Sequence, residues 1–107
     1  MILISHRGNI DGKKPHLENH PDYINEAIEL GYDVEIDIWL VDGILFLGHD
    51  EPQYEIDYKW LEDRSDRLWV HCKDIPSVEY FTENAIKCAE INWFWHENDT
   101  MTLTSFG

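Results

Sequence analysis

The sequence predicts a single domain of the α/β class, and two features of its 107 residues support that prediction. Short apolar runs, typical of buried strands, alternate with segments of helical periodicity. Strands that are connected through helices form right-handed crossovers and therefore a parallel sheet. Hydrophobic residues make up 43% of the chain and include five Trp, which is enough to form a packed core.

The first strand and the first helix are predicted in the N-terminal third. Residues 1–6 form an apolar run that predicts a strand, and a polar loop follows it. The sequence Asn19-His20-Pro21 predicts a helix start, because proline is favoured in the first helical turn. Gly31 is placed to end this helix in the left-handed conformation. The apolar positions that recur at helical spacing between them are Ile24, Ala27 and Ile28.

A strand and a hairpin come next. Residues 32–39 alternate between apolar and polar side chains, which predicts a half-buried strand. The period of two puts Glu35 and Asp37 side by side on one face, opposite the apolar positions. Asp42-Gly43 separates two apolar runs and is typical of a two-residue hairpin turn. We therefore expect a β-hairpin insertion near residues 39–47.

The second half of the chain continues the alternation of helices and strands. It predicts a short helix at 57–63, a strand at 68–73, a helix from residue 74, a strand at 92–96 and the start of a strand in 101–105. Asp74 and Pro76 are typical of a helix start. The expected buried face of that helix consists of Val78, Phe81, Ala85 and Cys88.

The charge excludes several classes of partner. The chain carries 8 Lys and Arg against 22 Asp and Glu, a formal net charge of −14. Such a surface repels nucleic acids and anionic lipids, so we expect no nucleic-acid and no membrane partner.

The N-terminal apolar run is too short for a secretory signal, and Cys72 and Cys88 are too few for a disulfide scaffold. We therefore expect a soluble cytoplasmic protein with reduced thiols.

Polar residues suited to phosphate chemistry follow the apolar runs. His6, Glu35, Asp37, His71 and His96 all lie late in predicted strands, and the sites of α/β folds gather at the carboxyl ends of strands. Paired carboxylates bind divalent cations, and imidazole carries protons near neutral pH. Each group alone is more often a solvated strand edge or a hydrogen-bonded histidine. Together they predict metal-assisted cleavage of a phosphate ester.

The order and spacing of five motifs resemble those of the glycerophosphodiester phosphodiesterase family. The motifs are His6-Arg7-Gly8, Glu18-Asn19, the segment from Gly31 to Asp37, Asp42-Gly43 and His49-Asp50. The resemblance extends over residues 2–50 and, more loosely, to Lys73. It implies a TIM barrel, a bound divalent metal and hydrolysis of a small glycerophosphodiester-like substrate.

The resemblance also implies roles for individual residues. His6 and His49 correspond to the acid–base pair of the family, and Arg7 corresponds to the residue that holds the phosphate and stabilises its charge. Lys73 would join Arg7 in binding the substrate. The remaining expected substrate-site residues are Glu18 and Asn19.

The expected metal ligands are Glu35 and Asp37, with Mg²⁺ or Ca²⁺ as the first candidates. Where the family commonly has Glu-x-Lys on a later strand, this chain has His71-Cys72-Lys73. We therefore expect His71 as the third ligand, and imidazole shifts the metal preference towards Mn²⁺ or Zn²⁺. Alternatively, His71 contacts the phosphate. His96-Glu97 would either add ligands or serve the structure.

The length sets a further expectation. A TIM barrel takes about 250 residues, so 107 residues predict a partial or abbreviated barrel that lacks its C-terminal part. Two copies of the chain would complete each other as a homo-oligomer. Two other functions remain open at this point: a lyase similar to phosphatidylinositol-specific phospholipase C, and a non-catalytic half-barrel that binds a phosphorylated ligand or a partner.

Overall fold

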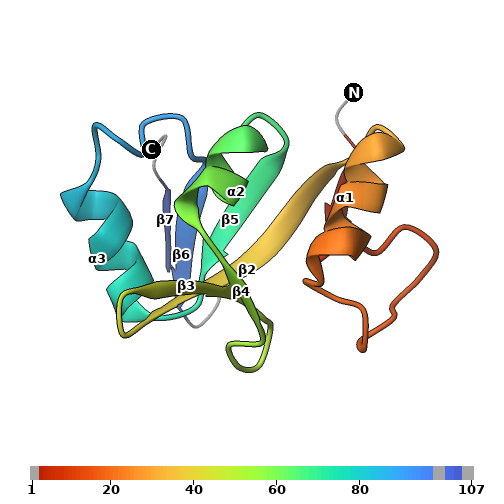
Figure 1. Ribbon diagram of the computed structural model, residues 1–107, viewed down its shortest axis with the longest axis horizontal. Coiled ribbons are helices and arrows are strands. Elements are labelled where there is room, and N and C mark those ends of the chain that lie inside the picture. Colours follow the sequence, from red (N-terminus) through yellow and green to blue (C-terminus); the bar gives the residue numbers. More distant parts are fainter. Residues whose placement is uncertain (1–2, 98–100, 105–107) are drawn as a thin grey trace.

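A computed structural model describes residues 3–97 and 101–104 of the chain. It is an α/β fold with three helices and a seven-stranded sheet (Figure 1). The strands are β1 (Ile4–His6), β2 (Asp33–Val41), β3 (Ile44–Leu47), β4 (Tyr54–Ile56), β5 (Leu68–Cys72), β6 (Trp93–Glu97) and β7 (Met101–Thr104). The helices are α1 (Pro21–Glu29), α2 (Tyr58–Asp63) and α3 (Ile75–Glu83). None of the helices in the described part is long and apolar enough to cross a membrane.

The sheet is mixed, and this corrects the expectation of a parallel sheet. Its strands lie in the order β4-β3-β2-β5-β6-β7, and β1 pairs with β2. The pairs β1–β2, β2–β5 and β5–β6 are parallel, whereas β2–β3, β3–β4 and β6–β7 are antiparallel. The parallel pairs join strands connected through helices, and the antiparallel pairs join strands connected by short turns or loops. Over the described residues the sheet is open and does not close into a barrel.

The hairpin predicted near residues 39–47 is confirmed. Asp42 and Gly43 both have positive φ, 52° and 79°, as a two-residue turn of type I′ requires. Strands β2 and β3 pair around this turn from Val41↔Ile44 to Ile38↔Leu47. The hairpin extends the sheet beyond β2, and β4 then continues it in the antiparallel sense.

Side-chain caps fix where the helices begin. His20 is the N-cap of α1 and its Nδ1 accepts a hydrogen bond from the Asp22 amide, while Gly31 follows the helix with φ 93°. Asp57 and Asp74 cap α2 and α3 in the same manner. Asp74 also accepts the Leu40 amide at 3.2 Å, so one carboxylate contacts β2 near its C-terminal end and starts α3.

Helix α3 is shorter than the sequence predicts. It ends at Glu83, and Asn84 is its C-cap. Ala85, expected on the buried face, is therefore exposed, whereas Cys88 is buried although it lies beyond the helix. Both cysteines are free thiols and both are buried.

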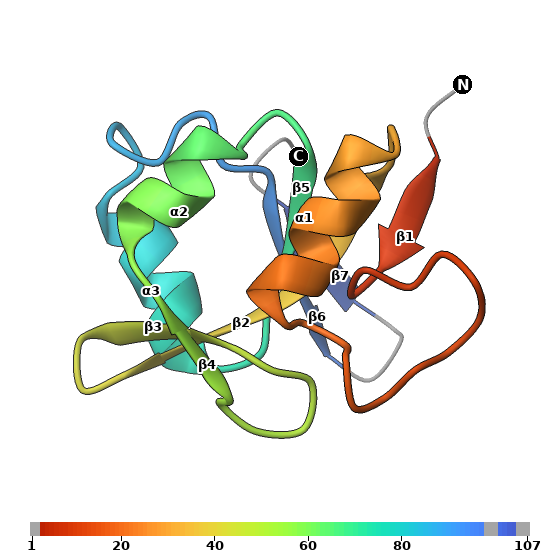
Figure 2. The same ribbon diagram turned by 45° about the vertical axis from the view of Figure 1, so that its right-hand side comes forward.

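All three helices lie on one side of the sheet, as Figures 1 and 2 show. Over the described residues, the core lies between the helices and the sheet and consists of fifteen buried residues, among them Ile24, Ala27, Val34, Ile36, Ile38, Leu61, Val70, Cys72 and Phe81. On β2 and β5 these residues occupy alternate positions, so the intervening residues point to the face away from the helices. On β2 and β5 that second face carries Glu35, Asp37 and His71, three of the polar residues singled out in the sequence.

One edge of β2 changes partner along its length. Its first part pairs with β1 through Glu35, and its last part pairs with β3 from Ile38 onward. Between them, the backbone of Asp37 is bonded by groups outside both ladders. Its amide donates to Asn19 Oδ1 at 2.9 Å and its carbonyl accepts the Gly48 amide at 3.1 Å. We refer to this point on β2 as the partner-switch point.

Gly48 leads to a testable expectation, because a side chain there has no room. A Cβ on Gly48 would collide with the carbonyl oxygen of Glu51, which is backbone and cannot swing away. We expect Gly48→Ala to destabilise the protein by about 2 kcal/mol, in the range of overpacked sites. Gly12→Ala is the control, since open space surrounds Gly12 and only its φ of 89° opposes alanine. Denaturant unfolding measures both, and an equal loss in the two variants would contradict the steric argument.

Candidate active site

The polar residues gather on the sheet face away from the helices. In the parallel register His6 lies opposite Glu35, and Asp37 lies opposite His71. Neighbouring residues of parallel strands project to the same face, so these four side chains share it. His71 stacks on Phe94 of β6, with ring centroids 4.9 Å apart and planes 4° apart.

Asp37 is the centre of the cluster. Its side chain is fully buried and four polar side chains converge on its two carboxylate oxygens. Those contacts are Arg7 Nε at 3.0 Å, Asn19 Nδ2 at 3.0 Å, His71 Nδ1 at 3.2 Å and His49 Nδ1 at 3.4 Å. The segment after β1, the segment before α1, the loop after β3 and strand β5 therefore all meet at one carboxylate.

A second carboxylate, Glu18, fixes the other side of Arg7. Arg7 Nη1 donates to Glu18 Oε1 at 3.3 Å, and Glu18 is 6% exposed. Asn9 Nδ2 donates to the other oxygen of Glu18 at 2.8 Å, and the Tyr23 hydroxyl donates to Asn9 Oδ1 at 3.0 Å. Asn9 and Tyr23 were not among the predicted site residues, because neither stands in a motif that marks it.

The backbone near the cluster is strained. Arg7 and Asn19 have φ of 58° and 66°, values that non-glycine residues adopt at a cost of about 1 kcal/mol or more. Gly8, between β1 and the loop, has φ 92°, and a Cβ there would lie 2.7 Å from the Tyr23 ring. Strained backbone that is held in place by surrounding contacts is typical of functional sites.

The two carboxyl groups of β2 have pKa values shifted in opposite directions. Burial, and then the charge of Asp37, raises the pKa of Glu35 to about 7, against the opposing effect of Arg7 and Lys73. Burial would also raise the pKa of Asp37, but hydrogen bonds from His71 and Asn19 and the nearby Arg7 and Lys73 outweigh it and lower that pKa. At neutral pH the site therefore holds one carboxylate and one carboxyl that is about half protonated.

Glu35, Asp37 and His71 are able to share a metal ion. Each offers one ligand atom, and these atoms all lie within 4.8 Å of one another. Glu35 Oε1 is buried and has no hydrogen-bond partner, an arrangement that a cation would satisfy. Oxygen and imidazole ligands together suit Mn²⁺ or Zn²⁺ at least as well as Mg²⁺.

The other predicted site residues lie around this cluster in different ways. His6 is exposed and lines a cavity of about 440 Å³ together with Arg7 and Glu18. Among the described residues no hydrogen bond, ion pair or ring contact joins His6 to His49, and His49 Nε2 also lies 3.6 Å from Asp50 Oδ1. Lys73 influences the cluster through its charge rather than through an ion pair within the described part. The side chains of His96 and Glu97 lie outside the described part of the structure.

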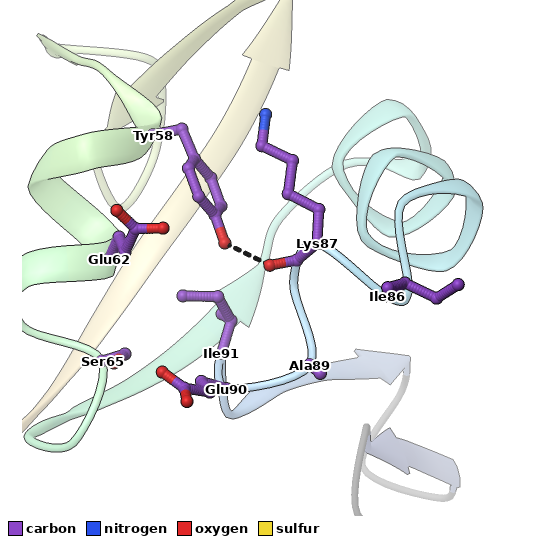
Figure 3. A pocket seen from close by; sticks show the side chains of 8 residues that line it. All are labelled: Tyr58, Glu62, Ser65, Ile86, Lys87, Ala89, Glu90 and Ile91. Carbon is purple, nitrogen blue, oxygen red and sulfur yellow. Dashed lines mark hydrogen bonds between the residues drawn. The ribbon is translucent and has the colours of Figure 1, made fainter.

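A second cavity lies away from these residues. It has a volume of about 320 Å³. Figure 3 shows the residues that line it: Tyr58, Glu62, Ser65, Ile86, Lys87, Ala89, Glu90 and Ile91. Within it Lys87 Nζ lies 4.4 Å from the centre of the Tyr58 ring, and the Tyr58 hydroxyl donates to the Lys87 carbonyl. Glu62 and Glu90 also line it, so its charge is unsuited to an anionic substrate.

Comparisons with family models, with curated proteins and with solved structures found no match to this chain. The functional interpretation therefore rests on the residues of the chain and on their geometry.

Asn19 provides a test of the cluster's architecture. It is fully buried, and its amide both donates to the Asp37 carboxylate and accepts the Asp37 backbone amide. We expect Asn19→Gly to lower the free energy of unfolding by about 2 kcal/mol, because two buried hydrogen bonds are lost while glycine still adopts the positive φ without strain. Asn19→Ala should cost about 1 kcal/mol more, since alanine also resists φ 66°. Chemical denaturation of both variants checks this order, and a more stable alanine variant would contradict it.

Proposed function

We propose that the protein is a metal-dependent phosphodiesterase that hydrolyses a small glycerophosphodiester-like substrate. The observation that supports this most is the convergence of Arg7, His49 and His71 on Asp37, beside Glu35. The sequence resemblance to glycerophosphodiester phosphodiesterases is consistent with the same residues in the same roles. Cationic, proton-transferring and metal-ligating groups at one point are the set such a reaction needs.

In this proposal Glu35, Asp37 and His71 hold the metal. The buried, unpartnered Glu35 Oε1 and the spacing of the three ligand atoms support that assignment. When bound, the ion would polarise the phosphoryl oxygens. Mg²⁺, Ca²⁺ and Mn²⁺ remain the candidates, and the imidazole of His71 favours Mn²⁺ among them.

Residues of the chain perform the remaining steps. Arg7, whose ion pairs with Asp37 and Glu18 orient the guanidinium, binds the phosphate together with Lys73. Of His6 and His49, one removes a proton from the attacking water and the other donates a proton to the leaving alcohol. His49 is held by Asp37, and His6 borders the open cavity from the end of β1.

The proposal extends to the architecture and the setting of the reaction. The parallel pairing of β1, β2, β5 and β6, with helices on one face, supports this proposal, because a TIM barrel is built from parallel strands that helices cover on one side. We propose that the chain represents part of such a barrel, completed in a homo-oligomer by a second copy. Two buried free thiols, Cys72 and Cys88, support a location in the cytoplasm, where lipid-derived diesters would be the substrates.

A second candidate is a non-catalytic module that binds a phosphorylated ligand. It is favoured by His71, which stands where the resembled family commonly has a metal-binding Glu. A lyase similar to phosphatidylinositol-specific phospholipase C would use the same residues, but the net charge of −14 opposes binding to anionic membranes.

Hydrolysis assays separate these candidates. Purified protein would be tested on bis(p-nitrophenyl) phosphate and glycerophosphocholine with Mg²⁺, Ca²⁺, Mn²⁺ or EDTA. We expect metal-dependent turnover that falls on the order of 10²-fold or more in His6→Ala and His49→Ala. His16→Ala, which removes an exposed histidine of the loop, is the matched control and should keep full activity. No turnover with any metal from folded protein would favour the binding module.

A further inference from the structure

A cavity that opens beside His6 and Arg7 has the features of a subsite for one end of the substrate. Its volume is about 440 Å³, and its walls come from β1 and from the loop that follows. Ile4 and Ile10 supply apolar surface in it, Lys13 supplies a cation, and Gly12 supplies bare backbone. A three-carbon alcohol fits such a volume with room to spare.

The loop that forms this cavity is held in place. Asn9 binds three partners at once: its Nδ2 donates to Glu18, and its Oδ1 accepts from the Tyr23 hydroxyl and from the Lys14 amide at 3.2 Å. The Glu18 amide in turn donates to the Lys14 carbonyl. The cavity wall is therefore ordered before any ligand arrives, which reduces the entropic cost of binding.

The distribution of basic residues is unusual for so acidic a chain. Four of the eight basic residues lie away from the candidate site, and each has a local partner. The pairs are Lys59 with Asp63, Arg64 with Asn25 and the Trp60 ring, Arg67 with Asp33, and Lys87 with the Tyr58 ring. Within the described part, no carboxylate lies in ion-pair distance of Lys13, Lys14 or Lys73. Unneutralised positive charge is thus found near the candidate site, where it attracts anions.

Arg7 and Lys13 differ in a way that suggests separate ligands. Arg7 is mostly buried and bound to Asp37 and Glu18, so it belongs to the reacting phosphate at the metal cluster. Lys13 is exposed, and its ammonium is able to reach a group further along the substrate. We propose that this cavity binds one alcohol of the diester and that Lys13 selects an alcohol that carries its own anionic group. The proposal rests on the proposed function for the identity of the site, but its test does not require turnover.

Binding of three compounds with the same three-carbon skeleton provides the test. Glycerol 3-phosphate carries one anionic group, 3-phosphoglycerate adds a carboxylate, and glycerol 1,3-bisphosphate adds a second phosphate. Calorimetry or NMR titration at low salt would give the dissociation constants for the intact protein and for Lys13→Ala. We expect the two compounds with a second anionic group to bind roughly 3- to 5-fold more tightly than glycerol 3-phosphate, which corresponds to the strength of an exposed ion pair.

In Lys13→Ala that preference should vanish, and Lys13→Arg should restore most of it. Lys59→Ala removes a lysine distant in sequence and should leave the preference intact. Whichever of 3-phosphoglycerate and glycerol 1,3-bisphosphate loses more affinity in Lys13→Ala identifies the anionic group that the cavity binds. An equal weakening of all three compounds by Lys13→Ala, or no weakening, would overturn the inference. A preference that depends on Lys13 in a protein without turnover would overturn the proposed hydrolysis and retain the subsite.

Discussion

Asp37→Asn is expected to lower metal-dependent hydrolysis on the order of 10³-fold while the protein stays folded. Asparagine keeps the shape of the side chain, and its oxygen is able to accept from Asn19 while its amide donates to His71. The negative charge, however, disappears from a point that contacts Arg7 and His49 and that would supply a ligand to the proposed metal. Activity measured under saturating metal, with circular dichroism as the check of folding, tests this expectation.

Asp33→Asn is the matched control for this variant. Asp33 lies on the same strand and the same face, but its carboxylate binds Arg67 and the Trp69 indole rather than the cluster. We expect its activity to stay within about 2-fold of the intact protein, because surface pairs contribute little. If Asp37→Asn retained a tenth or more of the original activity, Asp37 would not be at the centre of the chemistry.

Glu35→Gln is expected to stabilise the metal-free protein at pH 8 and to weaken metal binding. Because the pKa of Glu35 rises to about 7 in the folded protein, the fold disfavours its charged form. Below the unfolded pKa of 4.5 the carboxyl is protonated in both states and costs nothing. As the pH rises towards 7 the unfolded state loses its proton first, so stability falls, and above 7 the cost is complete at about 3 kcal/mol.

Unfolding free energies at pH 4.5 and pH 8 in the presence of EDTA measure this effect. Glu35→Gln should lie within about 0.5 kcal/mol of the intact protein at the lower pH and exceed it by up to about 3 kcal/mol at the higher. Metal binding should show the opposite ranking, and in the intact protein it should tighten up to about pH 7 as the proton leaves. Glu55→Gln, an exposed carboxylate on β4, should change neither quantity. A variant less stable than the intact protein at pH 8 would show that Glu35 is a favourable structural charge.

The sequence predicts local elements well where a strong periodicity or a specific turn signal is present. The alternation in residues 32–39 predicts β2, and Asp42-Gly43 predicts the hairpin, because both signals depend on near neighbours. The same signals say little about pairing further away. The expected parallel sheet is partly wrong because β3, β4 and β7 return along their neighbours after short connections. Likewise, the apolar spacing in α3 does not reveal that Asn84 ends the helix.

The same limit of sequence-based prediction applies to the candidate site. Period two places Glu35 and Asp37 on one face, and the structure keeps them there. Their different environments depend on His71 and on Asn19, which reach Asp37 from other parts of the chain. Asn9, which organises the loop around Glu18, carries no sequence signal of its own. Long-range polar contacts of this kind follow from the tertiary fold and not from local pattern.

The partner-switch point on β2 connects the polar cluster around Asp37 with the hydrogen bonding of the sheet edge. Where β1 ends and the hairpin begins, the amide of Asp37 is held by a side chain instead of a neighbouring strand. Amide hydrogen exchange at this single residue should therefore report directly on whether the cluster is assembled. Variants such as Asn19→Gly would accelerate exchange there first, before the flanking ladders open. Loss of the Asn19 contact would release the buried Asp37 carboxylate and, at the same time, weaken the join between two segments of one sheet edge.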